Sequence, residues 1–146
     1  MTQENKELVL KDLCARLPDK VIVDYAYNAF DVRKGNHVKH GSKCILNCYL
    51  LDVFISPRRN EKGEYIKPYL FPLSSMTSEQ LFEVQEILGK GVEICNGLIN
   101  IVDSSIKTFS FLELQAVFEW LLKNHFDINN LIPMGLAIDA TGLNIY

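Results

Sequence analysis

Apolar residues recur at helical spacing near the start of the chain. Residues 11–17 (KDLCARL) form an amphipathic segment whose apolar face consists of Leu13, Cys14 and Leu17. Pro18 disfavours α geometry in the residue before it, so we expect the helix to end near Leu17. The preceding residues 7–10 fit either a short strand or the first turn of this helix, and the pattern leaves both interpretations open.

The following segments are patterned as strands and loops. Residues 21–27 (VIVDYAY) are rich in β-branched and aromatic side chains and predict a strand. Residues 28–31 fit a turn, and we expect a second strand around Val32. Residues 33–42 (RKGNHVKHGS) are polar and basic and contain two glycines, which is typical of a loop or of the end of a hairpin.

The longest apolar stretch covers residues 43–55 (KCILNCYLLDVFI). Its spacing also fits a helix. Its β-branched and aromatic content and the Ser-Pro pair at residues 56–57 favour a central strand, which is our prediction.

A partner strand is expected after a charged turn. The turn is residues 58–64 (RRNEKGE), and the strand begins with residues 65–67. Two prolines flank residues 69–71, which suits an edge strand or an irregular segment better than a central strand.

A capping box at Thr77 and Gln80 predicts the start of a helix, because each residue's side chain satisfies a backbone amide of the other. We expect this helix to end at Gly89 or Gly91. Residues 92–102 then alternate around an Asn-Gly pair, which predicts a β-hairpin.

A second capping box, Ser110 with Glu113, predicts a helix over residues 111–124. Helical spacing gives it an apolar face. The members of that face are Leu114, Val117, Phe118, Leu121 and Leu122, with Trp120 at its margin.

The order of these elements defines the expected fold class. Asp127 is a candidate N-cap for a short helix over residues 128–132, and residues 136–138 are expected to return to the sheet. Strand-rich segments come early and the strongest helices come late, which favours an α+β fold. We predict a small, mostly antiparallel sheet with two or three packed helices, and the pattern leaves open whether the sheet closes into a barrel.

Length and composition indicate one domain over residues 1–146. Of the 146 residues, 48% are hydrophobic and 23% are charged, which suffices for a core without disulfides. The net charge of -3 is too small to indicate a dedicated nucleic-acid binder. No run approaches the ~18 apolar residues that span a bilayer, and the first residues lack the order of a secretory signal.

The four cysteines indicate a reducing compartment. Cys14, Cys44, Cys48 and Cys95 are irregularly spaced in a chain that needs no disulfide, so reduced thiols are the better interpretation. We therefore expect a cytoplasmic protein without a membrane partner.

Four residues could in principle bind a metal ion: His37, His40, Cys44 and Cys48. If both cysteines lie on one strand, their Cα atoms are ~13 Å apart, which is too far to share an ion. On a helix the two thiols would lie one turn apart. Unpaired cysteines are most often small buried hydrophobes, so we predict no metal site.

Other candidate chemistry also has a structural explanation. A cysteine–histidine pair would need contact and an orienting group, and no family-specific signature surrounds any cysteine. His125 and Asp127 suit a helix end and an N-cap. The Gly-Lys-Gly of residues 89–91 resembles a fragment of a phosphate-binding loop, but it follows a helix rather than opening one, so we interpret it as a helix C-cap. We predict no catalytic residue and no cofactor.

The strongest basic patch has seven members in loops 33–43 and 58–62: Arg33, Lys34, Lys39, Lys43, Arg58, Arg59 and Lys62. If the two loops share one end of a hairpin, these cations could meet an anionic partner. The alternative interpretation is two solvated loops.

These observations rank three hypotheses. Residues 65–73 combine aromatic residues with prolines and predict an exposed apolar patch, which favours a non-catalytic module that binds a protein partner or regulates it. The second hypothesis is an accessory protein that contacts nucleic acid through the two basic loops. A small Cys/His enzyme is the third.

Several blocks of the sequence resemble a known group. They are LCARLP (residues 13–18), KPYLFPLSSMT (67–77), WL (120–121), HFD (125–127), LI (131–132) and GLA (135–137). Together they resemble an uncharacterised family of short proteins from gut bacteria and their phages, whereas residues 92–107 match nothing in that family. The family has no assigned activity, so the resemblance implies only a phage or mobile-element origin.

Overall fold

The computed structural model describes residues 1–56, 65–89, 92–95, 98–101 and 110–146. It is an α+β fold, as predicted, with four α-helices in the described part of the chain. The helices are α1 (Gln3–Arg16), α2 (Cys48–Ile55), α4 (Ser78–Leu88) and α5 (Phe111–Lys123). The strands are β1 (Ile22–Asp31), β2 (Asn36–Ile45), β3 (Tyr65–Leu70), β4 (Val92–Cys95), β5 (Leu98–Ile101) and β6 (Ile138–Asp139).

The main sheet is open and mixed. Its strand order is β2-β1-β3-β6, with β2 and β3 antiparallel to β1 and β6 parallel to β3. The described strands therefore do not close into a barrel. A separate two-stranded sheet, β4-β5, is antiparallel.

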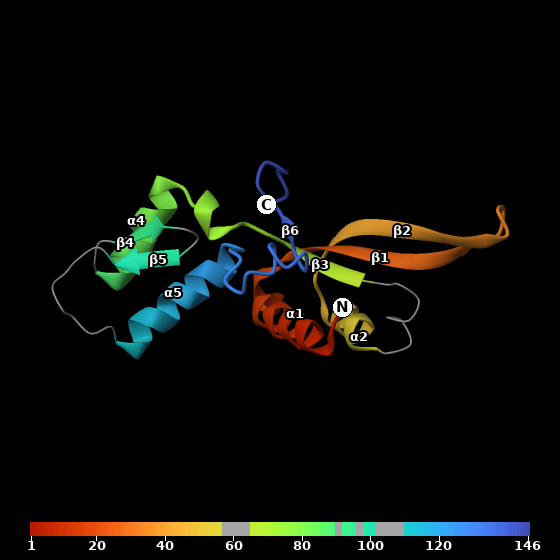
Figure 1. Cartoon of the computed structure of the whole chain (residues 1–146), viewed down its shortest axis with the longest axis horizontal. Coiled ribbons are helices and arrows are strands. Elements are labelled where there is room, and N and C mark those ends of the chain that lie inside the picture. The colour runs from red at the N-terminus through yellow and green to blue at the C-terminus, as the bar shows by residue number, and fades with distance from the viewer. Residues whose placement is uncertain (57–64, 90–91, 96–97, 102–109) are drawn as a thin grey trace.

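The molecule consists of two lobes (Figure 1). In the sheet lobe, α1 and α2 lie against one face of the four-stranded sheet, and the β1–β2 hairpin extends beyond them. In the helical lobe, α4 and α5 pack on each other beside the small hairpin. Buried apolar residues form one cluster in each lobe. The prediction of a single domain stays a prediction.

Helix α1 is longer than the sequence pattern predicted. Thr2 is its N-cap and accepts a hydrogen bond from the Asn5 amide, so residues 7–10 are helical and not a strand. The end before Pro18 is confirmed. Cys14 is exposed, contrary to the expected apolar face; the buried residues are Val9, Asp12, Leu13 and Arg16.

The first hairpin turns later than expected. Residues 28–31 continue β1 instead of turning, and Val32 lies in the turn instead of a strand. The Asp31 carboxylate accepts the amide of Arg33 at 2.9 Å, and Gly35 adopts φ 63°. Strand β2 then covers most of the predicted loop, pairing with β1 over ten residues. Pairing with β1 thus overrides the polar composition of β2.

The prediction of one central strand over residues 43–55 is wrong. Strand β2 ends at Ile45, and α2 begins at Cys48. Asn47 is the N-cap, with its Oδ1 atom 3.0 Å from the Leu50 amide nitrogen. The polar residue that interrupts the apolar run therefore starts a helix.

Strand β3 is not at the edge of the sheet. Residues 65–68 pair with β1, and residues 69–70 pair with β6. Pro68 is tolerated where the pairing changes from β1 to β6, because a residue without an amide proton interrupts a ladder least at the end of its register.

The helical lobe follows the sequence predictions closely. Both capping boxes form, at Thr77 and at Ser110, and Gly89 ends α4 in the left-handed conformation. Strands β4 and β5 confirm the second hairpin, whose Asn-Gly pair lies outside the described residues.

The segment after α5 is irregular. Residues 128–132 form turns and not the predicted helix, although the Asp127 carboxylate does accept backbone amides, from Leu131 and Ile132 at 2.8 Å each. The predicted return to the sheet over residues 136–138 is confirmed at Ile138, where β6 begins, whereas residues 136–137 precede the strand. Within the described ranges, no helix has both the length and the apolar composition that a bilayer crossing requires.

Candidate functional site

The two faces of the main sheet differ in what covers them. Val23, Ile66 and Leu70 lie in the apolar cluster with α1 and α2. Strand alternation places Asp24, Lys43 and Lys67 on the opposite face, where the β2-β1-β3 register aligns them in one row. No described helix covers this second face (Figure 1). It is the polar face of the sheet.

Lysines on the polar face are paired with tyrosine rings of β3. The Lys39 ammonium lies 4.5 Å and the Lys67 ammonium 5.9 Å from the Tyr65 ring centroid, and the Lys43 ammonium lies 5.3 Å from that of Tyr69. Each such pair contributes about 0.5–1 kcal/mol where it is exposed. We call these five residues the cation–tyrosine face.

Asp24 lies between two of these cations, because it is paired with Lys43 on β2 and with Lys67 on β3. The Tyr65 hydroxyl donates to its Oδ2 atom over 3.4 Å. Burial, followed by the Asp24 charge, raises the pKa of both Tyr65 and Tyr69. Both phenols therefore stay neutral, and the face keeps a positive balance.

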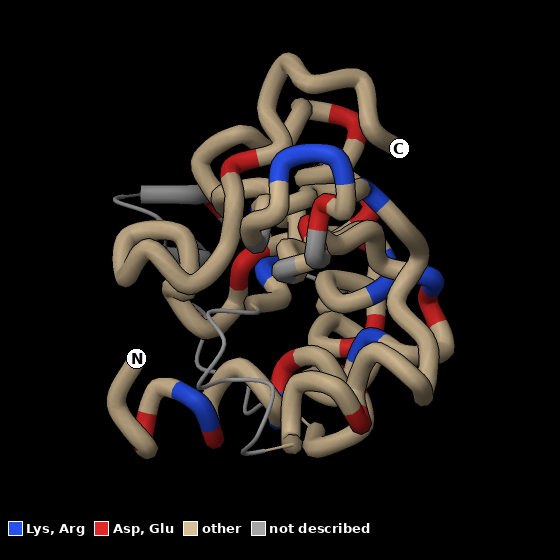
Figure 2. Tube along the Cα trace, turned by 90° about the vertical axis from the view of Figure 1, so that its right-hand side faces the viewer, with Lys and Arg blue, Asp and Glu red and all other residues tan. Residues whose placement is uncertain are grey.

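The structure brings together only part of the predicted basic patch. Lys39 and Lys43 belong to the cation–tyrosine face. Arg33 and Lys34 lie in the β1–β2 turn, which points toward the viewer in Figure 2. Arg58, Arg59 and Lys62 lie outside the described residues. Sequence reasoning missed Lys67, whose signal was its alternation with Tyr65 and Tyr69 in a strand.

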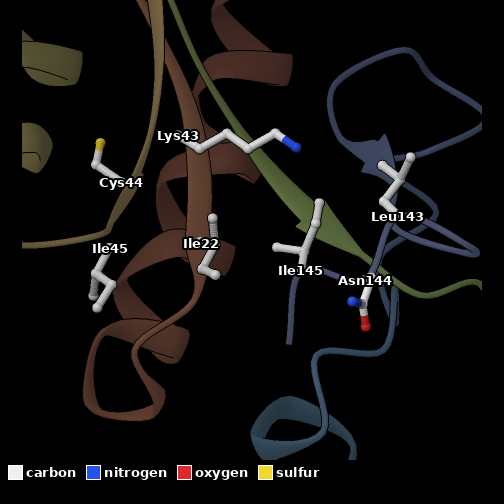
Figure 3. Close-up of a pocket in the computed structure, with 7 residues that line it drawn as sticks. All are labelled: Ile22, Lys43, Cys44, Ile45, Leu143, Asn144 and Ile145. Carbon is white, nitrogen blue, oxygen red and sulfur yellow. The ribbon is translucent and has the colours of Figure 1, made fainter.

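A cavity of about 320 Å³ adjoins the cation–tyrosine face (Figure 3). It lies between the ends of β1 and β2 and the C-terminal residues 143–145. Seven residues line it: Ile22, Lys43, Cys44, Ile45, Leu143, Asn144 and Ile145. Its walls are therefore mainly aliphatic, with one cation.

The cysteines and histidines do not form a reactive site among the described side chains. Cys14 and Cys48 are exposed, and Cys48 begins α2 instead of continuing the strand of Cys44. Burial is the main cause that raises the pKa of the Cys44 thiol, so Cys44 is not activated as a thiolate. No described group of three or more His, Cys, Asp or Glu residues could bind a metal ion.

His125 lies where the two lobes meet, next to the C-terminal residue Tyr146. The two rings stack with centroids 3.9 Å apart, and the buried Nδ1 atom has no hydrogen-bond partner. Burial, assisted by the Arg16 charge, lowers the pKa of His125 to about 4. His125 is therefore neutral at pH 7, so the expected interaction of a histidine cation with the end of α5 is not made.

Arg16 makes that interaction instead. Its side chain is fully buried and forms a bidentate ion pair with Asp12, with Nε–Oδ2 and Nη2–Oδ1 distances of 2.7 and 3.1 Å. It also donates to the carbonyl of Leu122, in the last turn of α5, and to that of Phe126, beyond the end of the helix. This cluster joins the lobes, and the sequence analysis did not detect it.

Only part of the apolar face of α5 is buried. Val117, Leu121 and Leu122 are buried as predicted. Leu114 and Phe118 remain 52% and 51% exposed, and Phe111 is 79% exposed. These three residues are spaced i, i+3 and i+7 on one side of the helix; we call them the α5 apolar stripe.

The predicted apolar patch at residues 65–73 is not exposed. Ile66, Pro68, Tyr69 and Leu70 are buried, and the other side chains of this segment are half-buried. The segment is buried because β3 lies inside the sheet and Phe71 and Leu73 pack in the helical lobe. Helix α5 instead carries four of the large exposed apolar side chains, Phe111, Leu112, Leu114 and Phe118.

Comparison with family models, with curated proteins and with solved structures finds no match to this chain.

Proposed function

We propose that this protein is a non-catalytic module that binds a protein partner through the α5 apolar stripe. The supporting observation is the exposure of Phe111, Leu114 and Phe118 on the same apolar face of α5 that buries Val117, Leu121 and Leu122. Clustered exposed apolar side chains are uncommon on a free protein surface and are typical of interfaces. Covering the exposed part of each would contribute about 1 kcal/mol.

The charge of the two helices indicates the partner's chemistry. Helices α4 and α5 carry Glu79, Glu83, Glu86, Glu113 and Glu119 against one basic residue, Lys123. The stripe covers about 10 Å along the helix, which is two turns. A complementary partner is an amphipathic segment with an apolar side and basic flanks.

The test compares two phenylalanines of similar exposure. Phe118→Glu places a charge in the stripe. Phe82→Glu is the matched control. Phe82 is 58% exposed, and because residues two positions apart point to nearly opposite sides of a helix, it faces away from the buried Val84 and the core with α5. Both variants should fold with stability changes within about 0.5 kcal/mol.

Affinity capture from the native cell should recover a partner with the wild type and with Phe82→Glu, and lose it with Phe118→Glu. Binding of the isolated partner should also weaken as salt increases, because the flanks are oppositely charged. Loss of the partner with both variants, or recovery with both, contradicts the proposal. A large loss of stability in Phe118→Glu would show that the protein itself covers the stripe.

The origin and location of the protein remain proposals as well. The resemblance described above supports an origin in a phage or mobile element. Described cysteines without a disulfide, Cys14, Cys44 and Cys48, support a cytoplasmic location.

The cation–tyrosine face supports a second candidate function, contact with single-stranded nucleic acid. Lys39, Lys43 and Lys67 lie at the tyrosine rings on one face of the sheet, and Lys67 also donates to the Gly135 carbonyl. If all three contact phosphates, log K should fall with log salt with a slope of about −2. Fluorescence anisotropy with a labelled oligonucleotide measures this slope, and undetectable binding at low salt rejects this candidate.

A further inference from the structure

The cavity beside Lys43 has the form of a small ligand site. Ile22 and Ile45 come from the paired ends of β1 and β2, and Leu143 and Ile145 come from the C-terminal residues. In Figure 3, Ile22 and Ile145 lie on opposite sides of the gap, and the Lys43 side chain extends across it toward Leu143. Ile45 and Leu143 are 52% and 45% exposed, so the walls have aliphatic surface left to cover.

The cation of this cavity is held in place but not neutralised by direct contact. The Lys43 ammonium lies 5.3 Å from the Tyr69 ring centroid and, among the described residues, makes no hydrogen bond or ion pair. Asp24 is its neighbour in the register and interacts with the Tyr65 hydroxyl. The thiol of Cys44 points away from the gap in Figure 3, so it takes no part.

The wall contributed by the C-terminal residues is anchored to the sheet. The Tyr146 hydroxyl accepts the Ile22 amide at 3.1 Å and donates to the Tyr69 carbonyl at 2.8 Å. The Leu143 amide donates to the Ala140 carbonyl. The cavity therefore exists before a ligand arrives, which lowers the entropy cost of binding.

We propose that this cavity binds a small aliphatic carboxylate, with its chain against Ile22, Ile45, Leu143 and Ile145 and its carboxylate on Lys43. A volume of about 320 Å³ is near the lower end for ligand sites. Four aliphatic walls with one cation match an aliphatic anion better than a neutral molecule, which would leave the cation unpaired, or a purely ionic one, which would leave the walls uncovered. The proposal is independent of the α5 apolar stripe.

Octanoate, octanol and inorganic phosphate are suitable probes in an NMR titration of the full chain. Octanoate should shift the amide signals of residues 22, 43–45 and 143–145, and octanol and phosphate should bind at least about tenfold more weakly. Lys43→Gln should weaken octanoate binding by about tenfold. Lys39→Gln is the matched control, because it removes a lysine of the same face and strand, and it should leave the affinity unchanged.

Three results of this titration would overturn the proposal, and a peptide probe supplies a fourth. Octanoate could shift no signal of the cavity residues, octanol could bind as well as octanoate, or both lysine variants could weaken binding equally. A peptide that ends in leucine with a free carboxylate tests a different source of the same chemistry. If it binds more tightly than octanoate at these residues, the ligand is a polypeptide terminus and the small-carboxylate proposal is wrong.

Discussion

The two lobes expose opposite kinds of surface. The sheet lobe covers one face of its sheet with α1 and α2 and exposes a polar face with lysines on tyrosine rings. The helical lobe buries part of the apolar face of α5 and exposes the rest as the α5 apolar stripe, and its two helices are rich in glutamate. Each lobe thus leaves part of its surface exposed, and these exposed parts are where we place the proposed contacts.

The comparison also shows how the lobes are joined. Between the two apolar clusters lie a buried ion pair, Asp12–Arg16, and a stacked pair, His125–Tyr146. Polar contacts of this kind depend on geometry more than apolar contacts do. The junction should therefore be more sensitive to substitution than either exposed surface.

The largest effect is expected at Arg16. Arg16→Met removes the partner of the buried Asp12 and frees the carbonyls of Leu122 and Phe126, so it should lower the free energy of unfolding by about 3–5 kcal/mol. Denaturant unfolding followed by circular dichroism measures the loss. Replacing both members of the pair with apolar residues should cost less than Arg16→Met alone. A loss below about 1 kcal/mol would show that the cluster does not join the lobes.

The next effect is a pH dependence at the same junction. The pKa of His125 is lowered from 6.5 to about 4 in the folded chain. As the pH falls from 6.5 toward 4, the unfolded chain binds a proton that the folded chain excludes, so stability decreases in that window and levels off below it. The expected loss is on the order of 1–3 kcal/mol, allowing for partial exposure.

His125→Asn should remove this contribution to the pH profile, because asparagine does not titrate and tolerates the φ of 60° at this position. Thermal unfolding at several pH values between 7 and 4 provides the measurement. A profile that the substitution leaves unchanged would contradict the assignment.

A smaller effect compares the helix caps of the two lobes. Asn47→Ala in the sheet lobe and Thr77→Ala in the helical lobe should each lower stability by about 1 kcal/mol. If the chain is one cooperative domain, both substitutions should shift the same unfolding transition by similar amounts. Two transitions, each shifted by only one of the variants, would instead show two independently unfolding lobes.

The smallest effect is expected on the polar face. Lys39→Gln removes the cation 4.5 Å from the Tyr65 ring and should cost no more than about 1 kcal/mol. Lys34→Gln, in the exposed turn, is a control that should change nothing measurable. If Lys39→Gln costs as much as Arg16→Met, the polar face is part of the stabilising core and not a free surface.

The sequence predicted best what depends on neighbouring residues. Both capping boxes form because the side chain and the backbone amide that it binds are three positions apart. Gly89 ends α4, and the end of α1 before Pro18 follows from the same local rule. The α+β class followed from the order of such elements.

The boundaries that failed depend on partners far along the chain. Strand β2 is polar and was taken for a loop, but its pairing with β1 makes it a strand. Residues 43–55 fit both periodicities, and the packing of α2 on α1 and β3 decides in favour of a helix after Asn47. In the same way, β3 is central because β6 joins its other edge from nearly seventy residues away.

The candidate sites were the least predictable part. The sequence by itself determined which residues are lysines, tyrosines and aliphatic residues, and it determined the local caps that start and end the helices. Only the tertiary structure decided that Lys39 and Lys43 lie over rings of β3, that residues 143–145 close a cavity against β1 and β2, and that half of the apolar face of α5 stays uncovered. The physical reason is that a capping hydrogen bond forms within one turn of chain, whereas register, burial and ring contacts arise only when distant segments are brought together.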